Sequence, residues 1–304
     1  MPDDSPPTRL EFLTTPTEAI ANFAPACMVY AAAGTRRQAA LAGIRSDSEE
    51  YAHWSRTQML TTCNLVFEHG VKHIFTILAT PGQFQEIGRY RTQLLDWIDW
   101  GVAGSEALAD YCRLGWRVRL VGAHEIEVLA KTRRRLCALP DPPGAPTLWY
   151  WVIPDVDAPW RWLRDAICST NGTRADAIRA LYSEEVPPVT LYLAFGKPIV
   201  ADYLLPPLLG ETVQCYWTQR PGYALTQNEL RTILYDYAFL RPTWRADKTL
   251  RGEEAIDHRA SWERATILGL GRRLGPFWYP ELDSTSTAPE INVARQEAPW
   301  PFAP

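Results

Sequence analysis

The segment Gly34-Thr35-Arg36-Arg37 is the part of this 304-residue sequence best suited to chemistry. Glycine permits a tight turn and a close approach of the backbone to a ligand. Each guanidinium can bind two phosphate oxygens at once. The segment therefore predicts a clamp for a diphosphate group, although a solvated basic loop would have the same composition.

Two further segments could add positive charge to such a clamp. Phe195-Gly196-Lys197 again places a cation beside a glycine, and Arg89 and Tyr90 lie near the start of an expected helix. A solvent-facing side chain is the ordinary interpretation of each cation. Neither segment defines a site by itself, but both repeat the chemistry of the first.

These residues depend for their position on the strands that precede them. The sequence contains six apolar, β-rich runs, at residues 27–33, 71–79, 116–121, 148–153, 189–195 and 213–217. Helical patterns separate the runs, one starting at the N-cap Ser48 and another at the capping box of Thr226 and Glu229. Such alternation is typical of an α/β fold with a mostly parallel sheet, in which ligands bind at the carboxyl ends of the strands.

The two ends of the chain differ from its middle. We expect residues 1–23 to form a flexible N-terminal segment, residues 24–283 a single domain, and residues 284–304 a Pro-rich flexible tail. The net charge of −4 argues against nucleic-acid binding. The sequence contains no apolar run long enough for a transmembrane segment and no signal-peptide pattern, so we expect a cytoplasmic protein.

Other residue patterns point to other chemistries. Asp155-Val156-Asp157 matches the paired carboxylates with which some nucleotide-sugar enzymes hold a metal. The flanking Pro154 and Pro159 favour a turn before a helix instead. The six cysteines are scattered singly, without the spacing of metal ligands, so we expect no protein-held metal from them.

The order of several segments resembles one known family. The matching residues are Gly34-Thr35-Arg36-Arg37, Glu49-Glu50-Tyr51, Phe67-Glu68-His69-Gly70, Arg89-Tyr90, Phe195-Gly196-Lys197, Ile233-Leu234-Tyr235-Asp236 and Leu240-Arg241. In this order they resemble the tuberculosinyl transferases, which are terpene synthases built on the cis-prenyltransferase fold. The resemblance spans about residues 24–280. It implies a central six-stranded, mostly parallel sheet flanked by helices.

The resemblance implies an enzyme that ionises a C15–C20 allylic prenyl or terpenyl diphosphate and releases diphosphate. Water, another acceptor or loss of a proton would then quench the carbocation. The expected diphosphate-binding residues are Gly34, Thr35, Arg36, Arg37, Arg89 and Lys197. Tyr51 and Tyr90 would face the allylic carbons, and Asp202 stands where the family has an aspartate. Aromatic faces stabilise a cation by about 0.5–2 kcal/mol each, which makes Trp54 a pocket candidate.

One position departs from the family. Its members have an aspartate directly before the glycine of the first loop, at the phosphate and Mg²⁺ site, and this chain has Ala33 there. The resemblance implies Mg²⁺ and a homodimer, but Ala33 removes the expected metal ligand. Ala33 also fits a second hypothesis, a non-catalytic partner subunit of a cis-prenyltransferase. The intact Gly-Thr-Arg-Arg segment favours the enzyme.

Overall fold

The computed structural model describes residues 7–85, 89–170, 172–201, 203, 210–240, 252–253, 256, 259, 268–275 and 277–280. For residues 89, 90, 210 and 211 it describes the backbone alone. The chain divides into two compact units, Met1–Asp247 and Lys248–Pro304. The single domain expected over residues 24–283 stays a prediction. The predicted tail, residues 284–304, lies outside the described residues.

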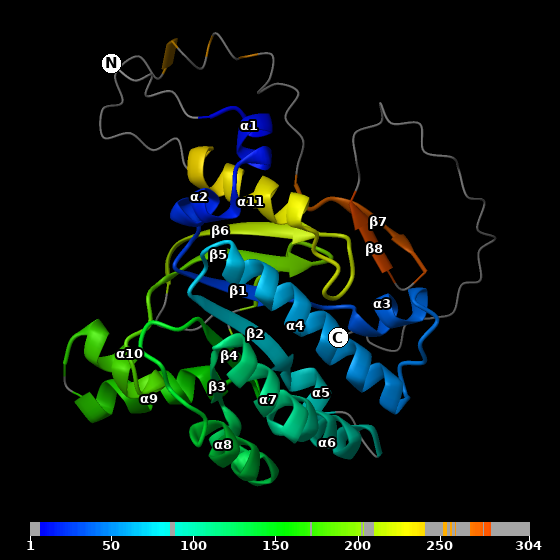
Figure 1. Ribbon diagram of the computed structural model, residues 1–304, viewed down its shortest axis with the longest axis vertical. Helices are drawn as coiled ribbons and strands as arrows, with labels where there is room; N and C mark the ends of the chain where they lie inside the picture. Colours follow the sequence, from blue (N-terminus) through cyan, green and yellow to red (C-terminus); the bar gives the residue numbers. More distant parts are fainter. Residues whose placement is uncertain are drawn as a thin grey trace, which may run out of the picture. The chain divides into compact units, whose positions relative to one another are not determined.

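The first unit contains a six-stranded sheet, as predicted (Figure 1). Its strands are β1 (Cys27–Ala31), β2 (His73–Ala79), β3 (Arg117–Val121), β4 (Thr147–Val152), β5 (Val189–Phe195) and β6 (Gly210–Thr218). Their order is β3-β4-β2-β1-β5-β6, and every neighbouring pair is parallel. The first strand thus has β2 on one side and β5 on the other. This reversal of strand order is a topological switch point, where ligands bind in such sheets.

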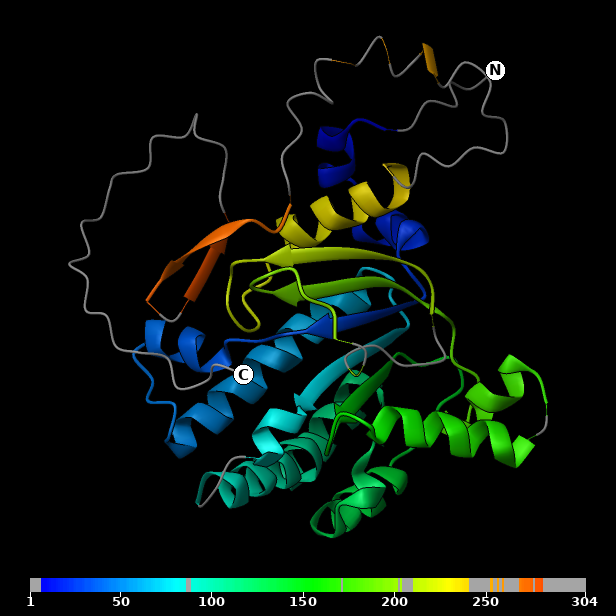
Figure 2. The ribbon, with the colours of Figure 1, turned by 180° about the vertical axis from the view of Figure 1, so that it is seen from behind.

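Helices cover both faces of this sheet (Figures 1 and 2). One face packs against α4 (Glu49–Glu68), α6 (Arg89–Ala103), α7 (Ser105–Leu114), α8 (Ala130–Cys137) and α11 (Gln227–Phe239). The other packs against α9 (Ala158–Thr170) and α10 (Arg174–Tyr182). Burial on both faces explains why the central strands are continuously apolar, as in the wholly buried β4.

The first strand and the segment after it differ from the prediction. The first strand ends at Ala31, and the Gly-Thr-Arg-Arg segment, expected as a loop, opens the short helix α3 (Thr35–Leu41). The short helix α5 (Pro81–Gln85) precedes α6, and two 3₁₀ turns, Ala123–Glu125 and Glu127–Leu129, precede α8. Helix ends depend on capping contacts, which sequence periodicity does not encode.

The N-terminal segment also differs from the prediction. Within residues 7–23, expected to be flexible, the chain forms α1 (Arg9–Thr14), α2 (Thr17–Ile20) and a 3₁₀ turn, Ala21–Phe23. Phe12 and Ile20 are at most 1% exposed and belong to the core on the α4 side of the sheet. The burial of these two apolar side chains explains why a stretch rich in Pro and Thr is ordered.

The second unit contains an antiparallel hairpin of β7 (Gly271–Leu274) and β8 (Phe277–Pro280). This hairpin includes most of the glycine-rich stretch from Gly269 to Gly275. A glycine-rich loop that binds a dinucleotide joins a strand to a helix, so the position of this stretch in a hairpin does not fit such a loop.

Candidate active site

A cavity of about 760 Å³ lies at the carboxyl ends of β1, β2 and β5. Its wall includes successive residues of β2, Ile77 and Leu78, whose side chains belong to opposite faces of the sheet. The cavity therefore reaches both faces of the sheet at the carboxyl ends of the strands, beside the switch point. Its size is within the range of pockets that enclose a small organic ligand.

Gly34 brings the predicted clamp to the cavity. Its φ is +80°, which glycine adopts without strain. A Cβ at this position would lie 3.1 Å from Pro221 Cβ and 3.2 Å from Phe195 Cε1. The left-handed backbone and the two close neighbours together favour glycine at position 34. Gly34, Thr35 and Arg36 all line the cavity.

A turn at residues 219–223 supports the clamp, and sequence reasoning missed it. The Gly222 amide donates to the Ala33 carbonyl at 2.7 Å, and the Tyr223 amide donates to Gln38 Oε1 at 2.9 Å. Tyr223 also lines the cavity. The Pro221-Gly222 dipeptide was the available signal, because it predicts a turn, but nothing in the sequence showed which segment the turn would contact.

Tyr51, a predicted catalytic residue, lies beside the clamp. Its hydroxyl and the Thr35 hydroxyl are 2.7 Å apart, in a hydrogen bond that either can donate. Its ring is 9% exposed and contacts Trp97 edge to face, with 5.7 Å between ring centroids. The N-cap Ser48, whose side chain accepts from the Tyr51 amide, fixes this first turn of α4.

Two of the predicted cations line the cavity. Arg36 and Lys197 are exposed and come from the segments after β1 and β5. Arg37 is not among the lining residues, and its guanidinium instead stacks over the Phe195 ring, 5.0 Å from the ring centroid. A ligand anion at this mouth would have positive charge from two strand ends, with Arg37 holding the ring beside Gly34.

The interior of the cavity is apolar and aromatic. Met59, Leu94 and Ile98 are at most 8% exposed and form part of its wall. Trp97 and Trp100 of α6 also line it, whereas the predicted Trp54 does not. The lining residues of α4 form one stripe along the helix. Trp54 directly precedes the lining residue Ser55 in the sequence, so its side chain points to a different side of the helix, outside that stripe.

Three predicted site residues lie outside what the structure describes. Arg89 and Tyr90 begin α6, but their side chains are outside the described part of the chain. Asp202 is outside it altogether. The predicted roles of these three residues remain predictions.

The position of the family's metal ligand does not fit Mg²⁺. Ala33 lines the cavity and offers a methyl group where the metal would need an oxygen. Across the described residues, no group of three or more His, Cys, Asp or Glu side chains could hold a metal ion.

Asp155 and Asp157 form a turn, as their prolines predicted. Asp155 Oδ1 accepts from the Asp157 amide at 2.9 Å, and Oδ2 accepts from Arg161 at 2.7 Å. The arginine holds the pKa of the Asp155 carboxyl below its usual value. Neither aspartate is among the residues that line the cavity, so the nucleotide-sugar alternative has no support at the site.

Solved structures share the fold. Lavandulyl diphosphate synthase from Lavandula x intermedia, in complex with dimethylallyl diphosphate, superposes with a TM-score of 0.54 at 10% identity. A probable undecaprenyl diphosphate synthase from Campylobacter jejuni superposes with a TM-score of 0.50 at 11% identity. Each match covers 72% of this chain and 97% of the other. The fold is that of the cis-prenyltransferases.

Sequence comparison identifies the family. The chain is 47% identical over 287 residues to (+)-kolavelool synthase from Herpetosiphon aurantiacus, across 94% of this chain and 99% of that protein. It is 24% identical over 259 residues to tuberculosinyl adenosine transferase from Mycobacterium tuberculosis, across 76% and 82%. No family model matches. The chain belongs to the kolavelool synthase family and is an enzyme, a terpene synthase with the cis-prenyltransferase fold.

Proposed function

We propose that this enzyme ionises a C15–C20 allylic prenyl or terpenyl diphosphate in the 760 Å³ cavity and releases diphosphate. The observation that carries the proposal is the division of the cavity into a cationic mouth and an apolar interior. Arg36 and Lys197 lie at the mouth, and Met59, Leu94 and Ile98 lie inside. An amphiphile with a charged head and a hydrocarbon tail matches this division.

The first step breaks the bond between the allylic carbon and the diphosphate oxygen. Both electrons leave with the diphosphate, so negative charge grows on its oxygens, where the Arg36 guanidinium and Lys197 ammonium are placed to stabilise it. The carbocation remains in the interior, where the faces of Tyr51 and Trp97 attract positive charge. Both effects lower the barrier to ionisation.

The oligomeric state and the location of the protein are part of the same proposal. We expect a homodimer, from the resemblance to the tuberculosinyl transferases, and a cytoplasmic location, as expected from the sequence. Within the residues described, no helix is long and apolar enough to span a membrane. Light scattering on the purified protein would measure the oligomeric state, and a monomeric mass would contradict that expectation. The alternative of a non-catalytic partner subunit has no support, because the chain belongs to a family of terpene synthases.

The test is release of diphosphate by the purified chain from farnesyl, geranylgeranyl and cyclised diterpenyl diphosphates, with and without Mg²⁺. Arg36→Ala should lower kcat/KM by about 10²–10³-fold, the usual effect of removing one donor that faces the developing charge. Arg37→Ala should lower it too, by releasing the Phe195 ring.

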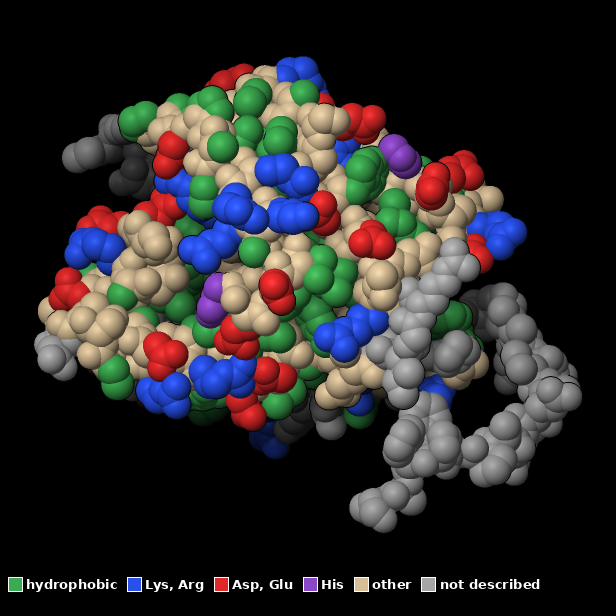
Figure 3. Space-filling model, turned by 90° about the horizontal axis from the view of Figure 1, so that it is seen from below, with side chains coloured by type: hydrophobic (Ala, Val, Ile, Leu, Met, Phe, Trp, Pro, Cys, Tyr) green, Lys and Arg blue, Asp and Glu red, His purple; other side chains and the backbone are tan. Residues whose placement is uncertain are grey.

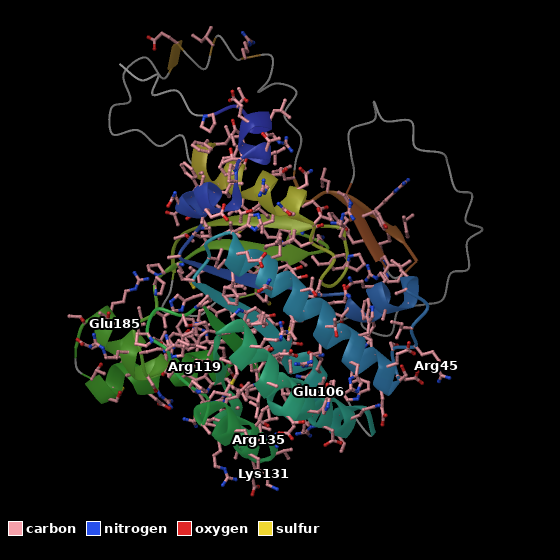
Figure 4. All side chains as sticks on the ribbon, viewed as in Figure 1. Arg45, Glu106, Arg119, Lys131, Arg135 and Glu185 are labelled. Atoms are coloured by element: carbon pink, nitrogen blue, oxygen red, sulfur yellow. The ribbon has the colours of Figure 1, made fainter. Side chains whose placement is uncertain are left out.

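Arg45→Ala provides the matched control. The Arg45 side chain is 81% exposed, pairs with Asp47 and extends into solvent from the segment between α3 and α4 (Figure 4). It is not among the residues that line the cavity. We expect wild-type turnover from this variant. Wild-type turnover by Arg36→Ala would remove the clamp from the mechanism.

A further inference from the structure

The apolar wall of the cavity contains a polar pair from consecutive residues of α4, Ser55 and Arg56. Two other hydroxyls of this helix, those of Thr57 and Thr61, donate to the backbone carbonyl four residues earlier, each at 3.0 Å. Within the described part of the chain, the Ser55 hydroxyl has no such partner, although it lines the cavity. It is therefore available to a molecule inside.

Arg56 is the buried member of the pair. Its side chain is 9% exposed, and its guanidinium donates to Asp110 of α7. Its Nε–H has no hydrogen-bond partner among the described atoms. Asp110 offsets the charge of the guanidinium, so the cation is tolerated in the wall of a cavity that holds a carbocation. Polar groups left at such a site are usually satisfied by water.

We propose that Ser55, with Arg56 beside it, holds the water molecule that captures the carbocation. This inference rests on the proposed function and selects one of its three ways of quenching the cation. Tyr51, Ser55 and Met59 follow one another at intervals of four residues along the wall, so Ser55 lies about 6 Å from Tyr51 along the helix axis. The water is thereby held between the diphosphate end and the hydrocarbon end of the cavity.

A lone pair of the water oxygen forms a new carbon–oxygen bond with the carbocation, and the resulting oxonium loses one proton. The released diphosphate takes that proton, and the product is an alcohol. Ser55 accepts a hydrogen bond from the water and orients it, so it is a positioning residue. Without it, the cation loses a proton to give an olefin instead.

The test measures how products are divided between alcohol and olefin. The enzyme is given, in H₂¹⁸O, the prenyl diphosphate from which it releases diphosphate fastest, and products are separated by gas chromatography and mass spectrometry. The wild-type alcohol should contain ¹⁸O. Ser55→Val should lower the alcohol-to-olefin ratio by roughly tenfold, the effect of losing one hydrogen bond to the water.

Ser55→Thr is the matched variant, because threonine has the shape of valine and keeps the hydroxyl. It should retain the wild-type ratio, so a difference between the two variants cannot come from added volume. Thr57→Ala removes an exposed hydroxyl from the same helix and should change nothing.

An unchanged ratio in Ser55→Val, or a wild-type alcohol without ¹⁸O, would overturn the inference while leaving the proposed function intact. Failure of the wild-type enzyme to release diphosphate from any substrate in the panel would overturn both.

Discussion

At the scale of single residues, the clamp depends on one glycine. Gly34 has a left-handed backbone and two close neighbours, Pro221 and Phe195. Any side chain would strain the backbone and displace the ring on which Arg37 stacks. The neighbouring Ala33 carbonyl is held by Gly222, so the segment has little freedom to relax.

Gly34→Ala should therefore damage both stability and turnover. We expect a loss of about 1–3 kcal/mol in the free energy of unfolding from the left-handed backbone, and a lower kcat/KM from the displaced clamp. Urea unfolding and diphosphate release measure the two effects. Gly43→Ala is the control, because Gly43 also has a positive φ, +76°, but a Cβ there would contact nothing within 4 Å. Equal losses of turnover in both variants would contradict the crowding argument.

At the scale of elements, one buried arginine joins the N-terminal helices to the rest of the first unit. Arg231 of α11 is 7% exposed and donates to the carbonyls of Leu13 and Thr15 at 2.8 and 2.9 Å. It also donates to Thr17 Oγ1 at 2.9 Å and to His69 Nε2 at 3.2 Å. A single side chain thus links α1, α2, α4 and α11.

Arg231→Met should loosen α1 and α2, because it leaves two partly buried carbonyls without their donor. We expect a loss of about 2–4 kcal/mol in the free energy of unfolding and faster amide exchange over residues 9–20. Hydrogen–deuterium exchange and urea unfolding measure these effects. Arg9→Met is the control, since Arg9 is exposed and has a long contact of 3.4 Å with Thr232. Unchanged exchange in Arg231→Met would show that burial of Phe12 and Ile20 alone holds the segment.

At the scale of the whole molecule, charged side chains lie on an edge strand of the sheet as well as at the mouth of the cavity. The edge strand β3 carries Arg117 and Arg119, which pair with Glu184 and Asp141. Charged side chains on an edge strand hinder pairing with other molecules. Figure 3 shows Lys and Arg side chains gathered on the surface seen from below. Figure 4 shows Lys131 and Arg135 on α8, and no residue of α8 lines the cavity.

Global stability should fall in mild acid because of His73. Its Nδ1 accepts from Trp149 Nε1 at 3.1 Å, and burial lowers its pKa to about 4. The unfolded chain, with an ordinary histidine pKa of about 6.5, takes up the proton first. The stabilisation of the folded chain by neutral His73 is therefore complete above pH 6.5. It is lost between pH 6.5 and 4, as the free energy of unfolding falls by about 1 kcal/mol per pH unit. Urea unfolding at pH 7.5 and 5 measures this change.

His73→Gln should reduce that pH dependence, because glutamine can still accept from Trp149 and does not titrate. Burial also lowers the pKa of His69, so part of the dependence should remain. A pH dependence identical to wild type would exclude His73 as its source.

The sequence by itself determined the strands, most of the helices and the place along the chain of the proposed clamp. Strand and helix periods are local, and the predicted loop residues Gly34, Arg36 and Lys197 follow apolar strands in a parallel sheet, so they had to meet at one edge. The family resemblance rested on this same order of segments. The sheet and the terpene-synthase class could therefore be predicted before any contact was known.

Only the tertiary structure decided which side chains face the cavity. Trp97 and Trp100 line it and Trp54 does not, because the rotation of each helix about its axis follows from its packing on the sheet. The turn at Pro221 and Gly222 reaches Ala33 across nearly 190 residues, and the Ser55 hydroxyl lines the cavity from a helix whose sequence marks no site. Such contacts depend on which faces meet, and that information is absent from local residue patterns.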